Sequence, residues 1–132
     1  MELIVSAYEE SRVRELSTIN RSIEMIKNYT NVDTDGGLRT SMSEFLECNK
    51  LEKIYVDAVI KKNIELIELI FQRINEKLMS IMDMSNELST QEDSCVNEKG
   101  YLTVCEYSKL KYEKIKTLHD IVKIYIIMSQ TI

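Results

Sequence analysis

The stretch of sequence that decides the fold is 60-IKKNIELIELIFQRINEKLMSIMDMSNEL-88. Its apolar side chains recur at alternating intervals of four and three residues, interrupted only by Ser85, which is the spacing of a coiled-coil face. The members of this heptad seam are Ile60, Ile64, Ile67, Phe71, Ile74, Leu78, Ile81 and Leu88. A second apolar row, formed by Leu66, Leu69 and Ile70, makes the stripe wider than a two-stranded coiled coil needs. The stretch therefore predicts the central helix of a bundle.

Helical spacing continues on the N-terminal side of the seam, through Met42, Phe45 and Leu51. One helix over residues 41–88 would rise about 72 Å at 1.5 Å per residue. That length is about twice the diameter, about 36 Å, of a compact chain of this size. We therefore expect either a rod-like molecule or a long central helix that bends, with the bend at Cys48-Asn49-Lys50.

Two further amphipathic helices are predicted, over residues 7–29 and 103–129, because each carries apolar residues at intervals of three and four. The polar stretch 89-STQEDSCVNEKG-100 has no periodicity and predicts a loop. The chain contains no proline and only three glycines, so few residues would interrupt long helices. The expected fold is all-α, an antiparallel three- to four-helix bundle in one domain spanning residues 1–132.

The helix over residues 103–129 has its own second apolar row, which includes Leu110, Ile121, Ile124 and Met128. The methionines Met79, Met82 and Met84, together with the apolar residues 124 and 126–128, offer more apolar surface than three helices folded alone would cover, and uncovered apolar patches mark interfaces. We therefore predict that the seam residues and the second-row residues Leu110, Ile121, Ile124 and Met128 form an interface. The expected partner is a second copy, as in a homodimer, or another protein of a multi-subunit complex.

Charge is unevenly distributed along the chain. The net charge is −5, which argues against general binding to nucleic acid. Residues 101–132 carry +2 and the rest of the chain carries −7, so we expect the C-terminal helix to contact the acidic body, within one chain or between chains. One stripe of that helix alternates in sign and predicts a solvated, internally paired face: Lys109, Glu113, Lys116, Asp120 and Lys123. Lys111 and Lys114 are left over.

The acidic stretch 31-NVDTDGGLRTSMSEFL-46 resembles an EF-hand calcium loop in two registers. One register has Met42 where the bidentate carboxylate belongs, and the other has Leu38 where the glycine belongs. A simpler interpretation is a chain reversal in which Gly36 and Gly37 supply positive φ angles and Ser41 with Glu44 caps the next helix. This interpretation is favoured, and no metal or other cofactor is predicted.

Few residues suit catalysis. His119 is the only histidine, no nucleophile, phosphate-loop or zinc-ligand motif is present, and we expect His119 to lie at the surface or its boundary. Three cysteines without a CxxC pair favour a reducing, intracellular setting, cytoplasmic or nuclear. No segment reaches the ~20 apolar residues of a membrane span. The chain is expected to be neither an enzyme nor a binder of small-molecule substrates.

The favoured function is a non-catalytic helical subunit or adaptor that self-associates or packs its seam against partner helices. One alternative is an export or assembly chaperone, because the chain is similar in size, acidity and helix pattern to the chaperones of flagellar and type III secretion. The other alternative is a calcium-responsive regulator that uses residues 31–44.

Overall fold

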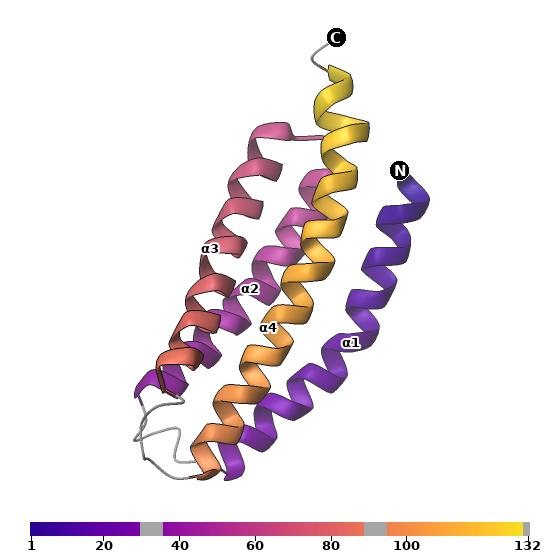
Figure 1. The fold of residues 1–132 in the computed structure, drawn as a ribbon. Coiled ribbons are helices and arrows are strands. Elements are labelled where there is room, and N and C mark those ends of the chain that lie inside the picture. The colour runs from indigo at the N-terminus through magenta and orange to yellow at the C-terminus, as the bar shows by residue number, and fades with distance from the viewer. Residues whose placement is uncertain (30–35, 89–94, 131–132) are drawn as a thin grey trace.

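The computed structural model describes residues 1–29, 36–88 and 95–130 of the chain. Within them lie four α-helices, α1 (Glu2–Tyr29), α2 (Gly36–Ile60), α3 (Ile64–Leu88) and α4 (Cys95–Val122), then a π-helical turn (Lys123–Ile127) and a 3-10 turn (Met128–Gln130). Successive helices run in opposite directions (Figure 1). α2 and α4 contact each other, α3 packs on one side of this pair and α1 on the other. The predicted all-α antiparallel bundle is confirmed.

The core of the bundle is formed mainly where α2, α3 and α4 meet. The seam residues Ile67, Ile74, Leu78 and Ile81 are buried there, against side chains of α2 and α4. Burying one such aliphatic side chain stabilises the fold by about 1.5 to 3 kcal/mol. The seam is therefore covered by helices of its own chain, which form the bundle that the wide apolar stripe predicts.

The long helix predicted over residues 41–88 is two helices, and the expected bend at residues 48–50 is wrong because the break lies at residues 61–63. Lys62 has a φ of 57°, the amide of Lys62 donates to Val59 O (3.1 Å) and that of Asn63 to Ala58 O (3.0 Å). These two bonds form a Schellman motif, which ends α2. Asn63 Oδ1 then accepts from the amide of Leu66 (3.3 Å) and caps α3. Each half is about 37 Å long at 1.5 Å per residue, so the bundle stays compact.

The other helix boundaries also differ from prediction. α1 begins at Glu2 instead of residue 7, and α4 begins at Cys95, so the predicted loop over residues 89–100 is wrong over its second half. Gly100 lies inside α4, where an added Cβ would come within 3.2 Å of Leu38 and 3.3 Å of Ile26. The glycine thus allows close approach of α4 to α1 and α2. Residues 89–94 lie outside the described residues.

The predicted helix cap formed by Ser41 and Glu44 is wrong. α2 begins at Gly36, so Ser41 is a buried residue inside the helix and Glu44 instead binds Lys77 Nζ at 2.6 Å. No glycine in the described part of the chain has a positive φ angle. Residues 30–35, with the first ligands of the calcium-loop resemblance, lie outside the described residues.

Candidate functional site

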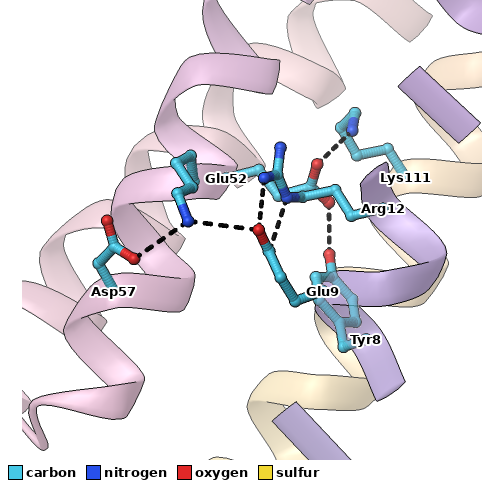
Figure 2. Close-up of polar contacts among 7 residues, drawn as sticks. Tyr8, Glu9, Arg12, Glu52, Asp57 and Lys111 are labelled. Atoms are coloured by element: carbon cyan, nitrogen blue, oxygen red, sulfur yellow. Dashed lines mark hydrogen bonds and ion pairs between the residues drawn. The ribbon is translucent and has the colours of Figure 1, made fainter. Parts of the chain in front are cut away.

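The most concentrated polar chemistry lies where α1 crosses α2 and α4 (Figure 2). Glu52 of α2 accepts two bonds, one from the Tyr8 hydroxyl of α1 and one from Lys111 Nζ of α4 at 2.7 Å. Beside it, Arg12 donates to both carboxylate oxygens of Glu9, at 2.6 and 2.8 Å. Lys53 then links Glu9 (3.3 Å) to Asp57 (3.4 Å). We call these seven residues the polar network; it joins three helices.

The two halves of the polar network differ in exposure. The Lys111 and Glu52 side chains are 7% and 4% exposed, whereas Lys53 and Asp57 are open to solvent. Burial beside Glu52 raises the pKa of Tyr8 far above its usual value, so Tyr8 stays a neutral donor. The hydrogen bonds from Arg12 lower the pKa of Glu9. The buried ion pair joins α2 to α4, where neither ion tolerates the loss of its partner, and the Tyr8 hydroxyl attaches α1 to this pair.

A side pocket of about 370 Å³ opens between α1 and α4, next to the buried half of the network. Tyr8, Arg12, Glu52 and Lys111 form its polar wall, and Leu16, Ile19 and Leu110 contribute apolar surface. The exposed ion pair between Lys114 and Glu15 also lines it. Every cation of the pocket is already bound to a carboxylate, which leaves little charge for a ligand.

A larger hollow of about 840 Å³, which we call the end groove, lies on another side of α1 at the end of the bundle where α1 begins and α2 stops. Its floor consists of the buried residues Val5, Val59 and Ile126, and its walls carry the exposed residues Val13 and Ile60. Charged residues also line it: Glu2, Glu9, Glu10, Arg14 and Lys62. The end groove therefore has an apolar interior and a charged border, a common composition for a protein-binding surface.

The last turns of the chain project beyond the other helices at the same end of the bundle (Figure 1). They include the π-helical turn, whose closing bond runs from the amide of Met128 to Lys123 O. Ile126 points into the end groove, whereas Ile124 and Tyr125 are about 60% exposed. Isolated π-turns are frequent at functional sites. Large apolar side chains thus stand exposed beside an apolar groove.

His119 is buried, so its predicted position at the surface is wrong. Its ring stacks on Phe71 at 3.8 Å, and its Nδ1 lies 2.9 Å from the Tyr55 hydroxyl. Burial lowers the pKa of His119 and keeps the ring neutral near pH 7. These contacts make His119 a part of the core.

The structure divides the predicted interface residues into two groups. Those at the centre of the seam are buried in the bundle, with Ile64, Phe71 and Ile121 half-buried. Ile60, Ile124 and Met128 are exposed, and all three lie at the end with the groove. Leu110 is exposed at the side pocket, and the side chain of Leu88 lies outside the described part of the chain.

The charge pattern of the sequence predicted part of the polar network. The predicted contact between the basic C-terminal helix and the acidic body is confirmed within one chain, through Lys111 with Glu52 and Lys114 with Glu15. The five stripe residues from Lys109 to Lys123 are exposed, and no ion pair joins any two of them in the described structure, so their predicted internal pairing is wrong. The roles of Tyr8, Glu9 and Arg12 gave no sequence signal beyond membership of an amphipathic helix.

Comparison with known proteins gives no further guide to the site, because no family model, curated protein or solved structure matches the chain. Over residues 1–29, 36–88 and 95–130, no helix is both long enough and apolar enough to cross a membrane. The same residues contain no group of three His, Cys, Asp or Glu side chains placed to hold a metal ion.

Proposed function

We propose that this chain is a non-catalytic helical subunit that binds another protein in its end groove. The observation that carries the proposal is the end groove itself, about 840 Å³, with a buried apolar floor and exposed apolar walls at Val13 and Ile60. An apolar helical face laid into such a groove would remove these walls from water, and each Å² of apolar surface so buried contributes about 25 cal/mol before the costs of association.

The polar network supports the proposal by holding one wall of the groove. Glu9 lines the end groove, and both Arg12 and Lys53 bind its carboxylate. The preceding residue, Tyr8, is held by its hydrogen bond to Glu52. α1 is thereby held in one position on α2 and α4. A preformed groove has less conformational entropy to lose when a partner binds.

This proposal moves the interaction from the heptad seam to the end of the bundle. It keeps the intracellular setting predicted from the cysteines. A chaperone for exported proteins would use the same groove for a changing set of partners, and that alternative stays a prediction. The calcium-responsive alternative also stays a prediction, since residues 30–35, with the first ligands of its loop, lie outside the described residues.

The proposal is tested by comparing what binds to the wild-type chain and to matched variants. The Ile60→Lys variant places a charge on the groove wall, and the Met25→Glu variant places one on α1 far from the groove; the two native side chains are 62% and 55% exposed. Tagged chains are expressed in the native cell, and the proteins that co-purify are quantified by mass spectrometry.

We expect at least one protein, the untagged native copy of this chain included, to be recovered with the wild type and with Met25→Glu but reduced or lost with Ile60→Lys. The proposal is overturned when Ile60→Lys, shown to be folded by circular dichroism, retains every protein that the wild type recovers. A protein lost equally from both variants also counts against the groove, because Met25 is remote from it.

A further inference from the structure

We infer that the occupant of the end groove is the projecting C-terminal turn of a second copy of this chain, so that two copies bind each other reciprocally. This inference rests on the proposed function, and it names the partner. The groove and the projecting turn lie at the same end of one molecule (Figure 1). In a two-fold symmetric dimer the same surface of both copies meets, so a small interface contains the groove and the turn of each copy together.

The projecting turn has the chemistry that the groove would accept. Ile124 and Tyr125 are 59% and 62% exposed, on the face of the last turns opposite the buried Val122 and Ile126. Figure 1 shows the last turns of the chain extending beyond α1, α2 and α3. In the dimer, Val13 and Ile60 in the groove of one copy would cover Ile124 and Tyr125 of the other. The turn of the first copy would enter the groove of the second in the same way.

The border of the groove carries both signs, with Arg14 and Lys62 beside its carboxylates, and two of those carboxylates would pair with the cation of the projecting turn. Lys123 opens the projecting turn, and Glu2 and Glu10 line the groove. Within the described structure none of these three residues takes part in an ion pair, so each is available to one from another copy. Paired charges at the border of an apolar contact set its register more than its strength.

The reciprocal geometry makes a specific prediction for mixtures of two variants. The Ile124→Glu variant damages the projecting turn, and the Ile60→Lys variant damages the groove. Each variant alone forms a dimer with two damaged contacts. A mixed dimer has one undamaged contact, from the wild-type turn of one copy to the wild-type groove of the other, and one contact in which the new glutamate meets the new lysine.

The test is sedimentation equilibrium of wild-type, single-variant and mixed chains, from about 1 μM to about 500 μM. We expect the wild type to approach twice the 15.4 kDa of one chain. Each single variant should raise the dissociation constant by about tenfold or more, as truncations at the centre of an interface do. The equimolar mixture should recover most of that loss, and Met25→Glu should match the wild type.

A wild-type chain that stays monomeric throughout the range overturns the second-copy inference. The co-purification comparison then decides the proposed function separately, because it also detects proteins other than this chain. The inference also fails when the wild type forms dimers that neither variant weakens, or when the mixture is no tighter than the single variants. Circular dichroism of each variant verifies that its helix content is intact.

Discussion

Lys111 Nζ lies 2.7 Å from Glu52 Oε1, with both side chains almost fully removed from water. A buried pair of this kind contributes little net stability, because the cost of removing two ions from water is close to their mutual attraction. What the pair contributes is conformational specificity. Together with Tyr8, which donates to the other Glu52 oxygen, it allows one register of α1 on α2 and α4. That register determines where the walls of the end groove stand.

The Lys111→Met variant leaves the Glu52 carboxylate buried without its cation. We expect the free energy of unfolding to fall by about 3 to 5 kcal/mol, measured by urea denaturation. The triple variant Tyr8→Phe/Glu52→Leu/Lys111→Met removes the charges together and should regain most of this loss. Lys114→Met, which breaks the exposed pair with Glu15, should change stability by less than about 1 kcal/mol. Equal losses for Lys111→Met and Lys114→Met would contradict this account of the buried pair.

Substitutions at two adjacent residues of the turn between α2 and α3 should change the free energy of unfolding in opposite directions. Lys62 holds a left-handed conformation, which costs a non-glycine residue about 1 kcal/mol, so Lys62→Gly should raise the free energy of unfolding by up to that amount. Asn63→Ala removes the N-cap of α3 and should lower it by about 1 kcal/mol. Thermal and urea unfolding of both variants check the signs. A stabilising Asn63→Ala would show that Asn63 is not the cap.

Because His119 is buried, we expect the folded chain to lose stability in acid. Because burial lowers its folded-state pKa below the unfolded value near 6.5, the unfolded chain binds more protons below that pH. The contribution of His119 is thus fully present above about pH 6.5 and declines as the pH falls, by at most about 1.4 kcal/mol per pH unit. His119→Gln retains polar atoms and does not titrate. The loss between about pH 7.5 and about pH 5.5 should be smaller in this variant than in the wild type.

Asn49 is the clearest defect in the core. It is buried on α2, and neither its Oδ1 nor its Nδ2 has a hydrogen-bond partner in the described structure. Leaving such groups unpaired costs about 1 to 3 kcal/mol. The Asn49→Leu variant, of similar shape, should therefore raise the free energy of unfolding by about 1 kcal/mol or more in urea titrations. A large destabilisation would reveal that Asn49 does find partners in the folded chain.

The sequence predicted the bundle because the α3 pattern of Ile67, Ile74, Leu78 and Ile81 requires helices on its apolar face. It did not predict the turn at residues 61–63. The expected signal for a helix end is a glycine, and here Lys62 adopts the left-handed conformation instead. Asn63 was the available clue, since asparagine is among the best N-cap residues.

The site was harder to predict than the fold, for two physical reasons. Glu52 and Lys111 are 59 residues apart in the sequence, and charge patterning showed only that their helices attract, without the register that pairs them. The end groove depends on where three helices end relative to one another. Ile60 and Ile124 were both predicted interface residues, but the expected continuous helix placed Ile60 inside the seam instead of at an open end.

The central claim is that the end groove of one chain receives the C-terminal turn of another, and cross-linking of single-cysteine positions tests it most directly. The native thiols should interfere little once Cys95 is replaced by serine, because Cys48 and Cys105 are buried and burial raises the pKa of Cys48 to about 12. In this background, differently tagged Ile60→Cys and Ile124→Cys chains are mixed and treated with a short bismaleimide. The account predicts a covalent dimer carrying both tags, and none between Ile60→Cys and Met25→Cys. Equal yields for the two mixtures, or no dimer in either, would contradict it.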